Sequence, residues 1–401
     1  MGDMGDQSSR VAAPSPNPPG DTTLVAEVAH SLLSKIPGVE ISRHEPAAGV
    51  VNIVARISSG RPGKRLVFNG HLDTYPLCEH LPWTVPPTGG VLQNGRVYGR
   101  GVSDMKGGIA ASITAATVLA QHRELWAGEI MLTLAGDEES IGSQGSQWLL
   151  DNVEFARGDA MVCGDVGSRA VVRFGEKGLC WFEISAAGTS AHGAHVHRGI
   201  NAIDRMRAAL DAVKLLELIP VHAPEEVEKA IATASEISER ASGAGESETL
   251  QRVTVNIGCI NGGTLRNLIP SSATAEGDIR LPVGVSLAKI MDHLHEHLDK
   301  MDGVSWKIIQ AYEATYTSPS HPLVRCSLAA SERVTGQSAV ANMRAGASDS
   351  RLYRAAGISS VVVGLTPYGM GAEDEYVEVE GLLKLAQIHI LITLDFLKEG
   401  N

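Results

Sequence analysis

Apolar residues along the chain follow two kinds of spacing. Residues 22–36 carry them at helical spacing, which predicts an amphipathic helix. Short apolar runs at 50–57, 65–69, 130–134 and 160–163 predict buried strands, and the small residues of 107–119 predict a helix packed against them. Because strands and helices alternate as far as Val166, we expect an α/β fold with a mixed sheet sandwiched by helices.

A second pattern begins near residue 179. It predicts a strand at 179–186, a helix at 201–216, strands at 251–260 and 273–281, a helix at 287–298 and a strand at 304–312. This βαββαβ order is ferredoxin-like. We therefore predict an inserted domain at 179–312 and a first domain made of 21–178 and 313–401, to which an apolar strand at 359–365 returns. The charged segment 223–248 ends in a Ser/Gly-rich stretch and should be an exposed excursion.

Composition narrows the class of protein. Residues 1–20 are rich in Pro, Gly and Ser and lack the apolar core of a secretory signal, so we expect a disordered leader. A net charge of -12 argues against a nucleic-acid or anionic-membrane surface. No segment reaches the roughly eighteen apolar residues that span a bilayer. The five cysteines are scattered and never form a CxxC pair, which indicates reduced thiols in a cytoplasmic protein.

Candidate ligands follow the predicted strands. His71 and Asp73 end the run at 65–69, residues 137–139 (Asp-Glu-Glu) follow 130–134, and Asp165 follows 160–163, while Asp104 lies in a glycine-rich loop. Strand ends are where α/β proteins place chemistry. A lone histidine is more often a core residue, and an acidic run can be a solvated helix start. One imidazole with several carboxylates and no cysteine nevertheless suits zinc, manganese or cobalt in a hydrolytic site.

The motifs HLDTYP, GRGVSDMKGG and GDEESIGSQG, in this order and spacing, resemble the metal-dependent aminoacylase and carboxypeptidase family. That family includes acetylornithine deacetylase, succinyl-diaminopimelate desuccinylase and glutamate carboxypeptidase, and the resemblance covers roughly residues 66–382. It implies that His71 and Asp165 bind one metal, that Asp104 bridges two and that Glu139 binds the second. It also implies that Asp73 orients His71 and that Glu138 is the general base.

The resemblance extends into the inserted domain, which in this family is a lid through which many members dimerise. His192 of GTSAHGAHVHRGINAI matches a histidine that reaches the neighbouring subunit's active site and donates to the developing oxyanion. Val196 replaces the family's proline there. Asn267 and Arg280 match residues that receive a substrate carboxylate, although Arg280 is equally well read as a surface arginine. We interpret five further lid histidines as exposed: His195, His197, His293, His295 and His297.

One expected ligand is missing. The family's second metal site ends with a histidine four residues before a DEYV-like glutamate, and Gly371 stands at that distance from Glu375. We therefore expect one firmly bound ion per subunit.

The predicted function is hydrolysis of a C–N bond in a small carboxylate-bearing substrate, in a homodimer or higher homo-oligomer that binds neither nucleic acid nor membrane. Three alternatives stay open. They are an atypical aminohydrolase of an amino-aromatic acid such as 5-nitroanthranilate, a metallo-dipeptidase or carboxypeptidase, and a non-catalytic binding protein, which has no need of Glu138.

Overall fold

A computed structural model describes residues 13–78 and 80–398 of the chain. Its larger part is built on one mixed nine-stranded sheet with the order β1-β2-β6-β3-β7-β15-β8-β13, and β14 also pairs with β8. The strands are β1 (Glu40–Ala47), β2 (Val50–Ser58), β3 (Arg65–His71), β6 (Glu129–Ala135), β7 (Ala160–Cys163), β8 (Val171–Glu176), β13 (Thr315–Tyr316), β14 (Val340–Arg344) and β15 (Ser359–Val362). Because β3 runs parallel to β6 and β7, the carboxyl ends of these three strands share one edge.

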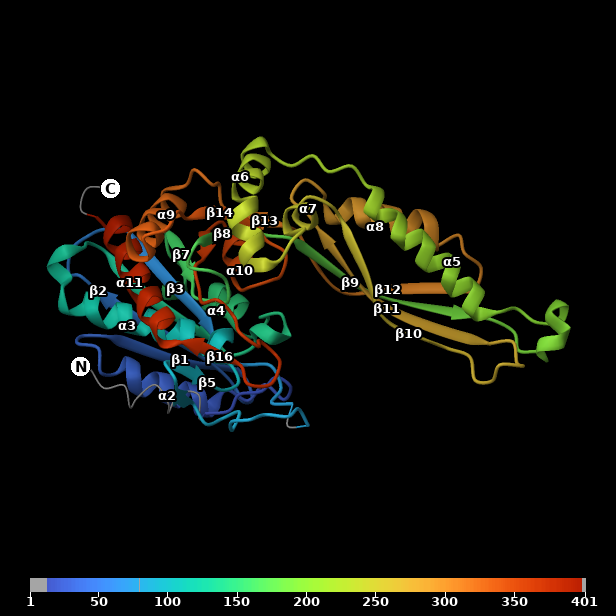
Figure 1. Ribbon diagram of the computed structural model, residues 1–401, viewed down its shortest axis with the longest axis horizontal. Coiled ribbons are helices and arrows are strands. Elements are labelled where there is room, and N and C mark those ends of the chain that lie inside the picture. Colours follow the sequence, from blue (N-terminus) through green and yellow to red (C-terminus); the bar gives the residue numbers. More distant parts are fainter. Residues whose placement is uncertain (1–12, 79, 399–401) are drawn as a thin grey trace.

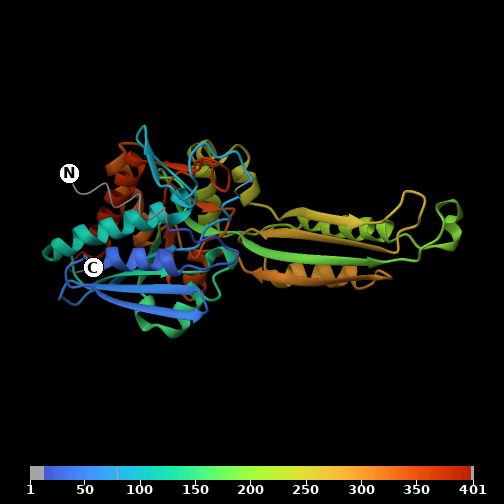
Figure 2. The ribbon, with the colours of Figure 1, turned by 90° about the horizontal axis from the view of Figure 1, so that it is seen from below.

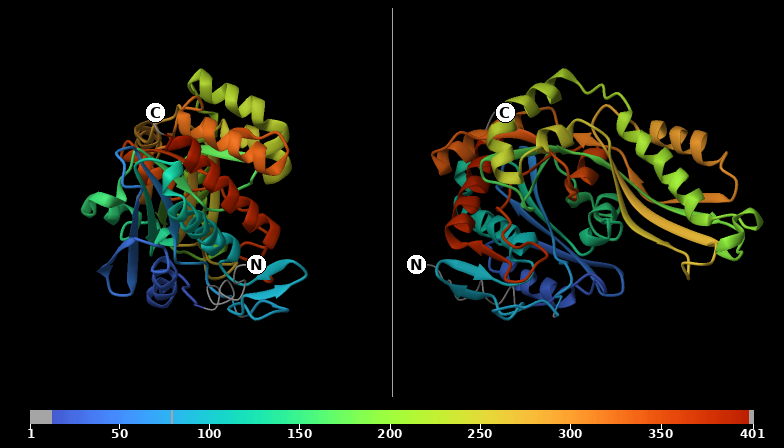
Figure 3. Two further views of the ribbon diagram at one scale, coloured as in Figure 1. Left: turned by 90° about the vertical axis from the view of Figure 1, so that its left-hand side faces the viewer. Right: turned by 45° about the vertical axis from the view of Figure 1, so that its right-hand side comes forward.

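Helices cover both faces of this sheet, as predicted (Figures 2 and 3). Neighbouring residues of a strand point to opposite faces. Phe68 of β3 stacks on His389 of α11, whereas Asn69 donates a hydrogen bond to Ser146 of α4. Burial on both faces explains why the central strands read as continuous apolar runs. Outside residues 179–312, the helices of this part are α2 (Thr23–Leu33), α3 (Gly107–Gln121), α4 (Ser146–Asn152), α9 (Pro322–Thr335), α10 (Ser350–Ala355) and α11 (Val379–Phe396).

A second, four-stranded antiparallel sheet extends away from the first as an elongated arm (Figure 1). Its order is β10-β11-β9-β12, and α5 (Ala202–Lys214) and α8 (Leu287–Leu298) pack on it. Phe182, Ile184, Met206 and Leu294 belong to its own apolar core, separate from that of the large sheet. The strands are β9 (Gly178–Ala187), β10 (Thr254–Gly262), β11 (Ser272–Leu281) and β12 (Val304–Tyr312). The βαββαβ order expected from the sequence is present.

The segment that was expected to be an exposed excursion instead packs on the large sheet. Its helix α6 (Glu225–Ser242) lies beside β14, and α7 (Glu246–Leu250) follows it. Val227 and Ile231 of α6 are buried in the core of the large sheet. Arg173 of β8 forms an ion pair of 3.0 Å with Glu246. The prediction was wrong because the apolar face of this helix does not reveal which sheet it covers.

The leader was expected to be disordered, and this is wrong for residues 13–20; residues 1–12 lie outside the described ranges. Ser15 donates its hydroxyl to the carbonyl of Leu72 (2.7 Å). The backbone N–H of Asn17 donates to the carbonyl of Thr74 (2.8 Å), and that of Thr74 donates to Ser15 (2.9 Å). This short stretch therefore lies along the chain that follows His71.

A small third sheet is formed by β4 (Val91–Gln93), β5 (Arg96–Tyr98) and β16 (Tyr376–Glu378), in the order β16-β5-β4. It brings the segment of Gly371 and Glu375 next to the turn that carries Asp104. Within the described ranges no helix is both long enough and apolar enough to cross a membrane.

Candidate active site

The polar residues that follow β3, β6 and β7 meet at the shared strand edge. His71 ends β3, and its Nε2 lies 3.0 Å from Oδ1 of Asp104, which comes from the turn between β5 and α3. Asp165 follows β7. Ligand atoms of His71, Asp104 and Asp165 all lie within 4.8 Å of one another, and the three residues are buried. Within the described ranges this is the only group of three or more such side chains with metal-ligand spacing.

Asp73 joins the elements of the site. Its backbone carbonyl accepts a hydrogen bond from Nδ1 of His71 (2.9 Å), closer than its own carboxylate Oδ1 (3.4 Å). The carboxylate accepts from the backbone N–H groups of Glu138 (3.1 Å) and Glu139 (3.0 Å), and from the amide of Asn17 (2.9 Å). A proton on Nδ1 leaves Nε2 free to act as a metal ligand. The backbone contact and Asn17 were not foreseen from the sequence.

The carboxylates are crowded in a way that fits a bound cation. Burial raises the pKa of Glu138 well above its usual value, although His71 and Arg351 oppose this shift. Burial, together with Asp104, raises the pKa of Glu139 to about 8 despite the opposing effect of His71. Oε1 of Glu139 is buried and lacks a hydrogen-bond partner among the described residues. Buried carboxylates require paired cations or metals, so this donor set fits a divalent ion.

The turn that carries Asp104 is held from the opposite end of the sequence. Glu375 is buried and accepts hydrogen bonds from the backbone N–H (3.0 Å) and hydroxyl (2.7 Å) of Ser103. It also pairs with Arg100 at 2.7 Å. The carbonyl of Gly371 accepts from the same guanidinium (3.0 Å). Gly371 has φ +75°, a left-handed conformation that favours glycine.

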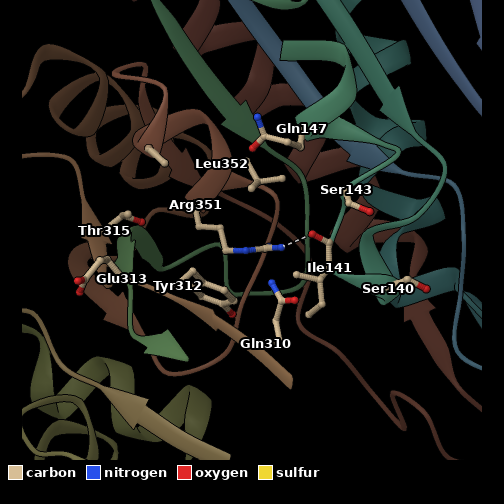
Figure 4. A pocket seen from close by; sticks show the side chains of 11 residues that line it. Ser140, Ile141, Ser143, Gln147, Gln310, Tyr312, Glu313, Thr315, Arg351 and Leu352 are labelled. Atoms are coloured by element: carbon tan, nitrogen blue, oxygen red, sulfur yellow. Dashed lines mark hydrogen bonds between the residues drawn. The ribbon is translucent and has the colours of Figure 1, made fainter. Parts of the chain in front are cut away.

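A cavity of about 430 Å³ lies beside Arg351, between the large sheet and the base of the arm (Figure 4). Arg351 extends across it toward the loop after Glu139 and donates to the carbonyls of Ile141 and Ser348, both at 2.8 Å. Its guanidinium lies over the ring of Tyr312 (4.8 Å) and 3.8 Å from Oε1 of Glu138. Arg351 was not foreseen from the sequence, because no motif distinguishes a buried arginine from a surface one.

The residues predicted in the arm are not brought to this site within one chain. His192 and Asn267 are exposed and lie in the loops at the far end of the arm, where the N–H of Gly193 donates to the carbonyl of Asn267 (Figure 1). Arg280 lies near the other end of β11, where it pairs with Asp278 at 2.9 Å. Its Nη1 is buried without a hydrogen-bond partner among the described residues.

Comparisons with known proteins agree with this architecture. The family model of peptidase family M20/M25/M40 matches residues 67–395. Succinyl-diaminopimelate desuccinylase from Rhodospirillum centenum is 29% identical over 367 residues, which cover 90% of this chain and 86% of the relative. The corresponding enzyme of Ruegeria pomeroyi is 28% identical, with 87% of each chain covered. An M20 family metallo-carboxypeptidase from Sulfolobus solfataricus shares the fold with a TM-score of 0.83 at 19% identity, covering 99% of each chain.

The fold and these relatives define a hydrolase that acts on amide- or peptide-type bonds. The chain belongs to peptidase family M20/M25/M40.

Proposed function

We propose that this protein is a metal-dependent hydrolase that cleaves a C–N bond in a small, carboxylate-bearing substrate. The observation that carries the proposal is the convergence of His71, Asp104 and Asp165 beside the largely buried carboxylate of Glu138. These three ligands would hold one zinc, manganese or cobalt ion and leave an open position. When bound there, such an ion acts as a Lewis acid and lowers the pKa of water.

The chain's own residues prepare the proton transfer. Glu138 is the general base, because a raised pKa makes its carboxylate a stronger proton acceptor. Asp73 fixes Glu138 through the backbone N–H group and fixes His71 through its carbonyl. Arg351, 3.8 Å from the Glu138 carboxylate, restricts where that carboxylate can point.

A single firmly bound ion per subunit is part of the proposal. A Bacillus subtilis protein with this fold (TM-score 0.68, 14% identity, covering 99% of this chain and 98% of that one) is described as a dinuclear metal-binding peptidase of the M20 family. In the present chain a second ion would rely on Asp104 and Glu139, because Gly371 has no side chain to offer. Two carboxylates without an imidazole would retain such an ion weakly.

The arm supplies the remaining parts of the proposal. His192 and Asn267 are exposed at its far end, so we assign them to the active site of a neighbouring subunit in a homodimer. His192 would donate to the developing oxyanion, and Asn267 with Arg280 would bind the substrate carboxylate. The cytoplasmic location expected from the sequence remains part of the same proposal.

A substrate panel tests the function. N-acyl amino acids, including N-succinyl substrates, dipeptides, C-terminally extended peptides and amino-aromatic acids would each be assayed with added Mn²⁺, Co²⁺ or Zn²⁺. We expect metal-dependent release of an amine from at least one substrate that bears a carboxylate. Turnover of dipeptides or of amino-aromatic acids alone would select those narrower activities. Binding without turnover by the wild type would instead indicate a non-catalytic binding protein.

A further inference from the structure

Arg344 lies beside the three candidate metal ligands, and no motif assigns it a role. It ends β14, and its Nη1 donates to Oδ2 of Asp165 at 2.5 Å. The side chain is 17% exposed. The other oxygen of Asp165 already accepts the backbone N–H of Val166, also at 2.5 Å. Both oxygens of this candidate ligand are therefore engaged, one of them by a permanent positive charge.

A guanidinium and a divalent ion compete for the same carboxylate. Arg344 remains charged at every accessible pH, and it would repel an ion placed at His71, Asp104 and Asp165. An ion that binds there must take over at least part of the negative charge of Asp165. The attraction that holds Arg344 in its present position would then weaken.

Arg344 also has space and free donors. It lines a cavity of about 520 Å³ together with Gly167, Gly243, Gly346 and Pro367. Among the described residues, only its Nη1 has a hydrogen-bond partner. The second arginine of this cavity, Arg173, is already engaged through both terminal nitrogens, which contact Glu246, Ser238, Ser242 and the carbonyl of Met343. Of the two arginines that line this cavity, Arg344 is thus the one with donors left to bind an anion.

We propose that Arg344 is a specificity residue that changes partners: it neutralises Asp165 in the metal-free site and, once the ion is bound, receives a carboxylate of the substrate in this cavity. The inference rests on the proposed function, because it requires an ion at His71, Asp104 and Asp165. Arg344 belongs to the same chain as these ligands, unlike the arm residues of a neighbouring subunit. Linkage is reciprocal, so a carboxylate bound to Arg344 must tighten metal binding as much as metal tightens carboxylate binding.

The test measures metal affinity and needs no turnover. Mn²⁺ would be titrated into the metal-free, full-length protein by calorimetry, alone and with succinate, using uncharged succinamide as the comparison. We expect succinate, and not succinamide, to tighten Mn²⁺ binding at least about fivefold in the wild type, within the usual range of coupling between sites. Arg344→Gln keeps a hydrogen-bond donor but loses the charge. It should bind Mn²⁺ about tenfold or more tightly without succinate and show no succinate effect.

Two further variants separate the possible causes. Arg344→Lys keeps the charge and should retain a metal affinity near that of the wild type. If Arg344→Gln does not fold, the comparison of succinate with succinamide in the wild type carries the test, and equal effects of the two compounds on Mn²⁺ affinity would overturn the proposal. Arg169→Met is the matched control. It removes a positive charge only four residues from Asp165, on a side chain that lies near Gly381 and Glu380. It should change neither the Mn²⁺ affinity nor the effect of succinate. Unchanged or weaker Mn²⁺ binding by Arg344→Gln would show that Arg344 merely supports Asp165 and would overturn the proposal. A succinate effect that persists in this variant, or equal tightening by Arg169→Met, would also overturn it. His71→Ala should abolish Mn²⁺ binding. If the wild type binds no Mn²⁺, or binds it equally well without His71, the proposed function itself is refuted.

Discussion

Replacing Glu375 by alanine should damage both stability and metal binding, because this one carboxylate holds the turn that presents Asp104. Glu375 is 1% exposed and accepts two hydrogen bonds from Ser103 and one from Arg100. Alanine leaves the buried guanidinium of Arg100 without the one acidic partner that it has among the described residues. Removing one member of a buried ion pair costs about 3–5 kcal/mol. The free energy of unfolding should fall by that amount.

Urea unfolding of the metal-free protein measures this loss, and Glu380→Ala provides a matched control. Glu380 also pairs with a cation, Lys384 at 2.6 Å, but its side chain is 76% exposed. A surface pair of this kind contributes about 0–1 kcal/mol. Residues that orient a metal ligand typically change metal affinity by about 10–100-fold, so Glu375→Ala should also weaken Mn²⁺ binding by that factor. Equal effects of the two substitutions on unfolding would refute this account of Glu375.

Three further changes test other parts of the site, and a fourth tests a buried lysine outside it. Glu138→Gln should lower turnover by about two to four orders of magnitude while metal content stays unchanged; comparable turnover would remove Glu138 from the mechanism. His192→Ala, mixed with Glu138→Gln under conditions of subunit exchange, should recover activity through hybrid dimers, and no recovery would mean that each subunit works alone. Asn17→Ala removes a hydrogen bond to Asp73 and should weaken Mn²⁺ binding, up to about tenfold; an unchanged affinity would show that the leader has no part in the site. Burial lowers the pKa of Lys177 to about 7, far below an unfolded lysine near 10.4. Between these two pKa values the folded chain therefore binds fewer protons than the unfolded chain. The free energy of unfolding, measured with urea, should rise by about 2 kcal/mol from pH 7 to pH 9. Lys177→Met should flatten that rise.

The sequence predicted those parts of the fold in which the spacing of apolar residues matches the faces that are buried. Strands β3, β6 and β7 are buried on both faces and so appear as apolar runs, and the polar residues just beyond them mark the strand edge. The βαββαβ arm has its own core and could be recognised by its order of elements. His71, Asp104 and Asp165 were grouped from spacing and resemblance, and their side chains do converge.

The parts that the sequence did not reveal depend on contacts between distant segments. The Pro-rich composition of the leader hides Asn17, whose amide reaches Asp73 across 56 positions of the chain. The charged exterior of α6 hides the apolar face that covers the large sheet. Arg344 reaches Asp165 across 179 positions, and no local spacing indicates such a pair. In the sequence, Glu375 served only as the reference point from which the missing histidine was located. The structure shows that its carboxylate accepts a hydrogen bond from Ser103.

The central claim is that His71, Asp104 and Asp165 hold one divalent ion. The most direct measurement is elemental analysis of the metal content per chain after reconstitution and removal of free metal, in the wild type and in Asp165→Ala. We expect one ion per chain in the wild type and a large loss in the variant. Full retention of the ion by Asp165→Ala, or two firmly held ions in the wild type, would contradict the assigned ligands or the single-ion site.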